Sequence, residues 1–472
     1  MVIAVNKMYY IKFIYIISLI VFSVSCSTNY IDAIKEVETN LYSQNFDKAI
    51  PIIRELVNEA DSKDKLLYLM EAGVVLHSKG DYSASNKAFR EADQIAETIN
   101  VSITKSAASF LLSDNESNFI GENFERVMIK MYIALNYLCL GDLENAKRYF
   151  QKLEFDLKDM KHSDATYKQI LLARYLDAIV SENLGKYNDA RVQYKNLLEL
   201  DPTRRDILAE RYSLAYKEND ANDMTKFSEG KYALASFNSS LARAELSPEM
   251  GELIIINEAG KTAVKESRGR LLDDQAFYLS LRTSIEVAIR SGSYQGLSVA
   301  GVLALIGSAE NPIPVYKTRE IESSVEFNIL INSKNITKLN KYTDYSEIAI
   351  KNYNENYNSI LAKNVASIST KIILAAVASY SAGQAVANRN DNNQLLGSAV
   401  SFVSGMAAGY AIASTLKPDL RCWRTMPSNF QAKRIYLIPG DYELTIKSNS
   451  KNFTKKVKVE KGKPSFIAFR TF

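Results

Sequence analysis

The sequence predicts an α+β protein of more than one domain, with an all-α N-terminal region and a mixed C-terminal domain. Three observations lead to this prediction. Similar turns recur before residue 248, β-branched strand patterns follow it, and a stretch rich in Ala, Gly and Ser lies between the strands. We therefore expect a helical repeat domain at 26–247 and a mixed domain at 248–472, with a helical hairpin inserted at 362–416.

The composition is that of an ordinary globular protein. Of the 472 residues, 47% are hydrophobic and 24% are charged. The 58 basic and 54 acidic residues give a formal net charge of +4 and are interspersed along the chain. Interspersed charge is typical of solvated helix faces, so nucleic acid is not an expected partner.

Residues that carry chemistry are few. The chain has two histidines, His77 and His162, and three cysteines, Cys26, Cys139 and Cys422. A zinc site needs about four such ligands at close spacing, and the sequence has no such group. It also has no phosphate-binding glycine loop and no set for nucleophilic catalysis. The sequence therefore predicts no metal, no cofactor and no catalytic residue, and it gives no ground for classing the chain as an enzyme.

The first 26 residues have the layout of a bacterial export signal. Lys7 and Lys12 precede an apolar run at 13–24, and Cys26 follows directly. This layout resembles the lipobox of bacterial lipoproteins, although Ser23 stands where Leu, Val or Ile is usual. A retained membrane helix or a buried helix is the alternative, but about 20 apolar residues are needed to span a bilayer.

This layout gives an expected address. We expect residues 1–25 to be a signal peptide, with Met8 as an equally good start to Met1, and a lipid on Cys26 to anchor the protein to a membrane. The expected location is the bacterial cell envelope, on the inner or outer membrane and facing the periplasm.

Five similar turns indicate repeated helical hairpins. They are Gln44-Asn45-Phe46, Gly80-Asp81-Tyr82, Gly141-Asp142-Leu143, Gly185-Lys186-Tyr187 and Gly230-Lys231-Tyr232. A small residue follows three positions after the apolar third residue of each turn, and a bulky residue often comes four positions later. This pattern resembles the tetratricopeptide repeat, and a plain helical bundle is the alternative. Stacked repeats form a concave surface, so a protein partner is expected.

After Pro248 the pattern predicts strands. Candidate strands are 251–261, 324–331, 434–438, 442–448, 453–459 and 465–469, with turns at Pro439-Gly440-Asp441 and Glu460-Lys461-Gly462-Lys463. A small antiparallel sheet or sandwich accounts for them most simply.

The stretch between these strands has two interpretations. Residues 397–415 are uncharged, and Gly405 and Gly409 have a spacing that lets helices pack closely. One interpretation is a hairpin that enters a membrane, acting in a membrane-active or pore-forming protein. The sequence favours the other, a helical hairpin buried in the protein, because the stretch is only marginally apolar.

The loop after this stretch carries the only Trp of the chain. Arg421 and Arg424 flank Trp423 at close spacing, which suits an acidic or glycan partner through bidentate and cation–π contacts. In the alternative interpretation, Trp423 is a core anchor and the arginines bond loop carbonyls.

The chain resembles a family of bacterial tetratricopeptide-type lipoproteins of unassigned function. Three stretches carry the resemblance: Gly121-Glu122-Asn123-Phe124-Glu125-Arg126-Val127 with Ala134-Leu135-Asn136-Tyr137-Leu138, then Gly251-Glu252-Leu253-Ile254-Ile255, and finally Asp419-Leu420-Arg421 through Trp423, Pro427 and Gln431 to Pro439-Gly440-Asp441-Tyr442. Cys422 stands where a small polar residue is expected. The resemblance implies an envelope lipoprotein with helical repeats ahead of a mixed domain, and it implies no catalytic residues.

These observations favour a lipid-anchored scaffold whose repeats recruit a protein partner in the envelope. A membrane-active protein that uses the hairpin at 364–416 is one alternative. A cell-wall glycan-binding protein or hydrolase that uses the Arg421 and Trp423 loop is another.

Overall fold

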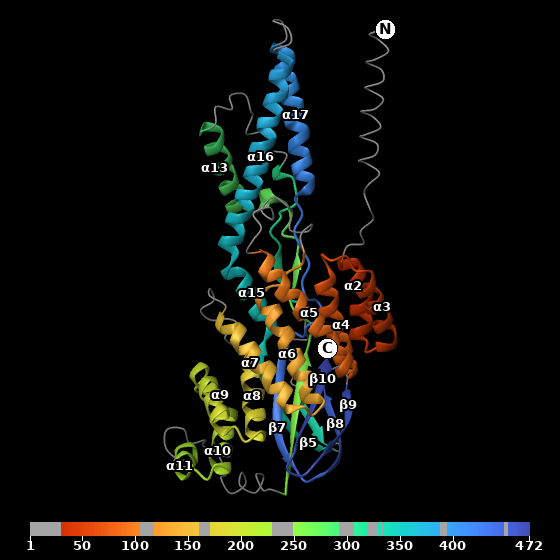
Figure 1. Ribbon diagram of the computed structural model, residues 1–472, viewed down its shortest axis with the longest axis vertical. Coiled ribbons are helices and arrows are strands. Elements are labelled where there is room, and N and C mark those ends of the chain that lie inside the picture. Colours follow the sequence, from red (N-terminus) through yellow and green to blue (C-terminus); the bar gives the residue numbers. More distant parts are fainter. Residues whose placement is uncertain are drawn as a thin grey trace.

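The computed structural model describes residues 30–103, 118–159, 170–228, 249–291, 306–319, 328–331, 334–387, 394–447 and 452–472. The molecule is elongated (Figure 1). Helical repeats and strands form a body, and one long helical hairpin projects from the end of that body.

Ten helices of the described part of the repeat region form five antiparallel pairs. Their bounds are α2 Tyr30–Tyr42, α3 Phe46–Glu59, α4 Lys65–Lys79, α5 Tyr82–Ile103, α6 Asn123–Cys139, α7 Leu143–Asp159, α8 Leu171–Asn183, α9 Tyr187–Leu200, α10 Arg205–Lys217 and α11 Ala221–Ser228. The predicted helical repeat region is thus present at the N-terminal side of the molecule.

The turns within the pairs use left-handed backbone conformations. Gly80 and Gly141 have φ of 94° and 77°, in the left-handed region that favours glycine. Gln44 and Asn219 take similar values at the first and last turns, 59° and 58°. The α10–α11 turn was not predicted because Asn219 replaces glycine there, and the turn predicted at Gly230 lies outside the described residues.

Small residues and bulky residues alternate in the seam between paired helices. Gly73 of α4 lies against Phe89 of α5, and a Cβ at Gly73 would come within 2.4 Å of the Phe89 ring. Ala146 and Phe150 of α7 are likewise buried, as the turn pattern predicted. Close approach of the backbones therefore depends on residue size.

The described residues of the C-terminal part form two four-stranded sheets with the orders β10-β1-β7-β6 and β5-β4-β8-β9, and a two-stranded pair β2-β3. The strands are β1 Gly251–Ala259, β2 Val264–Glu266, β3 Val315–Lys317, β4 Asn328–Ile331, β5 Lys334–Lys338, β6 Asn340–Asp344, β7 Asn429–Leu437, β8 Gly440–Lys447, β9 Asn452–Val459 and β10 Pro464–Thr471. The small sheets were predicted, but not all pairs are antiparallel, because β1 pairs parallel with β10.

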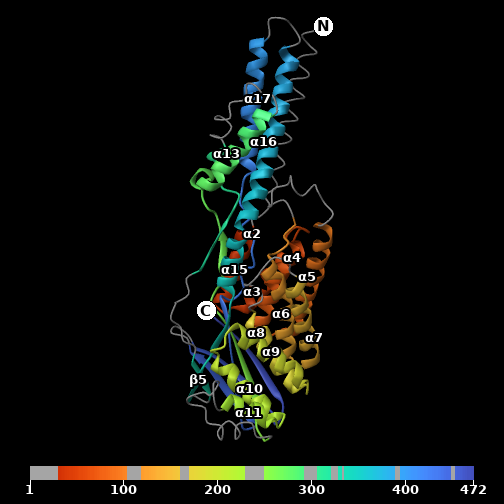
Figure 2. The same ribbon diagram turned by 90° about the vertical axis from the view of Figure 1, so that its left-hand side faces the viewer.

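The central strand β1 is buried on both faces. Leu253 and Ile255 pack against the second sheet, in a cluster that includes Leu444 of β8. Ile254 and Ile256 face the opposite way and join the core formed with the helical repeats. The body therefore has three layers, with the first sheet between the repeats and the second sheet (Figure 2).

The projecting hairpin consists of two long antiparallel helices. These are α16 (Tyr357–Ala387) and α17 (Gln394–Thr415), and α13 (Gln275–Ser291) packs along α16. The short helix α15 (Tyr345–Glu355) leads from the sheet into α16. Both figures show the hairpin extending away from the repeats and strands.

Candidate functional site

The inner face of the repeats carries one glutamate on the first helix of each described pair, buried in four of the pairs and partly buried in the fifth. We call these residues the glutamate row: Glu38 on α2, Glu71 on α4, Glu125 on α6, Glu182 on α8 and Glu210 on α10. Each accepts hydrogen bonds from the C-terminal half of the chain. Apart from Arg319, which also binds Glu38, these donors lie between residues 423 and 434, so this segment runs along the inner face.

Glu71 binds the backbone of this segment. Its carboxylate accepts the backbone N–H groups of Arg424 and Thr425 at 2.8 and 3.0 Å, together with the hydroxyls of Thr425 and Tyr30. Burial raises the pKa of the Glu71 carboxyl, although these hydrogen bonds oppose the shift. Glu71 therefore binds the main chain of this segment at Arg424 and Thr425.

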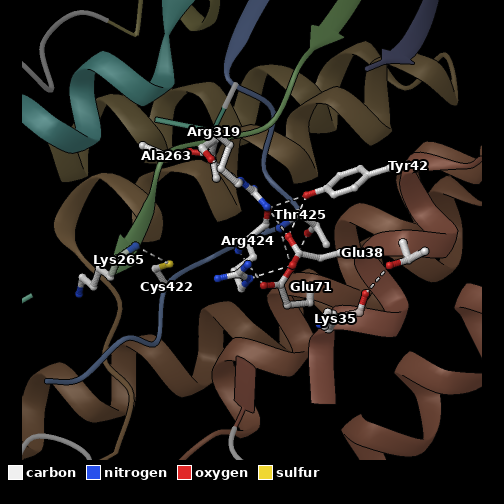
Figure 3. A network of polar contacts seen from close by, with 12 residues as sticks. Lys35, Glu38, Tyr42, Glu71, Ala263, Lys265, Arg319, Cys422, Arg424 and Thr425 are labelled. Atoms are coloured by element: carbon white, nitrogen blue, oxygen red, sulfur yellow. Dashed lines mark hydrogen bonds and ion pairs between the residues drawn. The ribbon is translucent and has the colours of Figure 1, made fainter. Parts of the chain in front are cut away.

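Glu38 pairs with two arginines, as Figure 3 shows. The Nε atom of Arg424 lies 2.9 Å from a Glu38 carboxylate oxygen, and Arg319 donates to the other oxygen. Arg319 also donates to the carbonyl oxygens of Arg424 and Thr262. Burial acts to raise the pKa of Glu38, but the two guanidinium groups outweigh it and lower this pKa.

Glu125 holds the loop at Trp423. One carboxylate oxygen accepts the Trp423 backbone N–H at 2.8 Å, and the other accepts the Glu122 N–H at 2.8 Å. The Trp423 ring is 1% exposed and packs against Phe89 and Tyr132, with centroids 5.8 Å apart in both pairs. Burial raises the pKa of Glu125 to about 7.

Arg434 of β7 closes the far end of the row. Its guanidinium contacts Glu182 at 3.1 Å, Glu210 at 2.9 Å and Glu252 of β1 at 2.7 Å. Lys217 adds contacts to Glu182 and Glu252 at 3.0 and 2.9 Å. Burial acts to raise the pKa of Glu252, but Arg434 and Lys217 prevail and lower it to about 2.

These contacts place the three residues that the sequence suggested for partner binding. Trp423 is a buried anchor between α5 and α6, Arg421 binds Asp64 and Asp419 at 2.7 and 2.8 Å, and Arg424 binds Glu38. None of the three is exposed, so this structure offers no open surface at the loop. The concave face, on which a partner was expected, is occupied by the chain itself.

A second buried cluster was not singled out from the sequence. His77 Nε2 lies 2.6 Å from a Glu258 oxygen, and His77 Nδ1 lies 2.6 Å from Asn136 Oδ1. Tyr132 donates to the other Glu258 oxygen at 2.7 Å. The side chains of His77 and Glu258 are 1% and 0% exposed, so the cluster joins α4 and α6 to β1 and is closed to a substrate.

Neither cysteine in the described part forms a disulfide bond. Cys139 and Cys422 are free, and burial raises the pKa of both thiols to about 12. Within the described ranges, no group of three or more His, Cys, Asp or Glu side chains is placed to hold a metal ion. Cys26, the expected lipid site, lies outside the described residues.

The hairpin exposes large apolar side chains. Leu395, Phe402, Val403 and Tyr410 of α17 are 86%, 62%, 65% and 70% exposed. Both helices are long and apolar enough to cross a membrane. Within the apolar 18-residue stretch of each helix, only 22% is buried in α16 and 11% in α17. The hairpin is therefore not buried in the protein, contrary to the interpretation that the sequence favoured.

Small residues hold the two helices of the hairpin together. A Cβ at Gly383 of α16 would come within 1.8 Å of Ser401 Oγ and 2.5 Å of the Gly397 carbonyl oxygen. Several hydroxyls bond inside their own helices, such as Ser379 to the Ala375 carbonyl at 2.7 Å and Ser404 to the Val400 carbonyl at 2.6 Å. These hydroxyls need no water, which suits an apolar surrounding.

Comparison with known proteins adds little. No protein-family model matches the chain, and no curated protein matches it. Among solved structures, "MamA MSR-1 C2" aligns with 42% of this chain and 92% of its own length, at 11% sequence identity and a TM-score of 0.28. A TM-score of this size establishes no common fold, so the repeats are assigned from their own helices and turns.

Proposed function

We propose that the protein is a membrane-seated scaffold whose α16–α17 hairpin crosses a bilayer while the body sits on one surface. The observation that carries this proposal is the exposed apolar surface of α17. Large exposed apolar patches on soluble proteins mark binding surfaces, because leaving them in water is unfavourable. Lipid is the partner that covers such a surface on all sides of a hairpin.

The dimensions and charges of the hairpin support this proposal. The stretch Leu395–Thr415 of α17 is 21 residues long, which is about 30 Å of helix and matches the hydrocarbon thickness of a bilayer. No charged residue lies at 372–387 or 394–416. Lys371 and Lys417 bound these stretches on the body side, and Arg389 and Asp391 lie between the two stretches in the sequence. Lysines at these positions suit the polar headgroup level.

The other parts of the chain complete the proposal. A lipid on Cys26 would be a second anchor and would place the body in a bacterial envelope. Residues 421–434 cover the inner face of the repeats, where they bind the glutamate row. A protein partner would therefore dock on the outer faces of the repeats. Exposed apolar residues there include Phe155 of α7 and Val192 of α9, at 70% and 54%.

Membrane extraction tests the hairpin separately from the lipid. Residues 1–26 are replaced by a cleavable secretory signal without the cysteine, so that neither lipid nor signal remains. We expect this protein to stay in the carbonate-resistant membrane fraction. Adding Phe402→Asp and Val403→Asp should release it, because each aspartate near the bilayer centre costs about 3 kcal/mol.

The matched control is Phe155→Asp with Val192→Asp, which changes exposed apolar residues of the body to the same side chain. These variants should remain in the membrane fraction. Complete release of the unlipidated protein with an intact hairpin would overturn the proposal.

A further inference from the structure

We propose that the root of the hairpin binds the headgroups of anionic phospholipids. Three basic residues form this surface, which we call the basic collar: Arg290 near the end of α13, Lys371 on α16 and Lys417 just after α17. This inference rests on the proposed insertion of the hairpin, and it adds which lipid the protein selects. The observation behind it is that three separate helices bring a cation to nearly the same level of the hairpin.

The register between the two long helices places Lys417 close to the level of Lys371. Gly405 of α17 faces Ser379 of α16. Lys417 comes 12 residues after Gly405, so in this antiparallel pair it lies level with about residue 367 of α16. The levels of the two lysines therefore differ by about one helical turn, or ~6 Å.

Helix α13 brings Arg290 to a similar level. The Tyr357 hydroxyl at the start of α16 donates to Asp274, just before α13, at 2.9 Å. From this point α13 packs along α16 and ends short of the tip of the hairpin (Figure 1). Arg290 comes 16 residues after Asp274, or about 24 Å of helix. Lys371 comes 14 residues after Tyr357, or about 21 Å of helix.

The helices that carry the collar have an excess of basic residues. Helix α16 has no acidic residue, and the one carboxylate of α13, Glu286, binds Arg282 at 2.8 Å. Over residues 357–418 the only acidic residue is Asp391, which lies between α16 and α17 in the sequence. Positive charge is thus concentrated where the uncharged stretches of the hairpin end. Anionic headgroups attract basic residues at this depth.

The exposed face of α13 suits the boundary between headgroups and acyl chains. Leu279 and Val287 are 56% and 61% exposed, and Arg290 is exposed within one turn of Val287. Helices that combine exposed apolar and basic side chains lie at this boundary, where lysine and arginine extend to the phosphates. Because the three cations come from three helices, a layer of headgroups fits them better than one soluble anion.

Spin-labelled lipids test the collar in the full chain. The protein is reconstituted into phosphatidylcholine vesicles, and electron paramagnetic resonance measures how much spin-labelled phosphatidylglycerol or phosphatidylcholine it immobilises. We expect phosphatidylglycerol to associate about fivefold more strongly, and this preference to fall at high salt. Combining Arg290→Gln, Lys371→Gln and Lys417→Gln should remove the preference.

The matched control removes the same charge from exposed lysines in and after β9, through Lys456→Gln, Lys458→Gln and Lys463→Gln. It should keep the preference. Equal association of the two lipids with the unchanged chain, or an undiminished preference in the collar variant, would overturn this inference and leave insertion in place. Release of the reconstituted chain from the vesicles by carbonate would instead overturn the proposed insertion, and the collar with it.

Discussion

At the scale of single residues, the members of the glutamate row differ in the direction in which their pKa is shifted. Glu38 faces two guanidinium groups, so its pKa is lowered in spite of burial. Glu71 and Glu125 accept mostly backbone N–H groups and hydroxyls, which balance burial less well, and their pKa values are raised. Burial raises the pKa of Glu210 as well, in spite of Arg434. Three of the five glutamates therefore gain protons more readily in the folded state than in the unfolded chain.

Glu125 makes stability depend on pH. Its pKa rises from 4.5 to about 7 in the folded protein, so the folded state binds more protons than the unfolded chain between these values. The free energy of unfolding should then fall by up to about 3 kcal/mol as pH rises through this window, and stay level above it. The emission of Trp423, the single tryptophan, reports melting at each pH.

The control is Glu125→Gln, which removes this titration. Asp177, whose pKa burial raises to about 6, gives a slope of the same sign in both proteins. The difference in slope between the two therefore belongs to Glu125. Equal pH dependence in both would show that Glu125 does not carry the shift.

At the scale of elements, sequence patterns succeed where one residue type decides a local conformation. The turn at Gly80 was predicted because its left-handed φ favours glycine, and the strand at Gly251–Ala259 was predicted from its β-branched residues. The turn at Asn219 was missed because asparagine is common outside turns. The exposure of α17 was missed because composition does not tell whether a helix is covered.

The hairpin depends on the absence of a side chain at Gly383. A Gly383→Leu change would drive the helices apart, since even a Cβ would meet Ser401 Oγ. Cysteines at Ser379 and Gly405 report this, because a Cβ at Gly405 lies 3.9 Å from Ser379 Cβ, close to disulfide geometry. We expect Ser379→Cys with Gly405→Cys to cross-link, and Gly383→Leu to abolish the cross-link.

Ala382→Leu is the matched control, since Ala382 is the exposed neighbour on the same helix. It should leave cross-linking intact. Efficient cross-linking in the Gly383→Leu background would mean that the close approach of the helices is not required.

At the scale of the whole molecule, the repeats and the C-terminal part form one unit through contacts that no local pattern predicts. Glu71 and Thr425 are 354 positions apart, and Arg434 is 252 positions from Glu182. The sequence has 54 acidic residues, and nothing near Glu71 or Glu182 in the chain distinguishes them. The repeat region was predictable because its turns are local, whereas the occupant of its inner face was not.

Substitution of Arg434 tests whether its buried ion pairs stabilise the contact between the repeats and the C-terminal part. Its side chain is 0% exposed and faces three carboxylates. Arg434→Met keeps most of the volume but leaves those carboxylates with Lys217 as their remaining cation here. We expect a loss of about 3–5 kcal/mol, as for other buried pairs that lose one partner. Hydrogen exchange should become faster in α8, α10 and β7.

The matched control is Lys433→Met, because alternate residues of a strand face opposite sides and Lys433 points away from the repeats. It should change stability little. Adding Glu210→Gln and Glu252→Gln to Arg434→Met should restore part of the loss, since uncompensated charge and not lost packing is its cause. Equal stability of the Arg434 and Lys433 variants would contradict the role of the charge cluster, and failure of the glutamine changes to restore stability would assign the loss to packing.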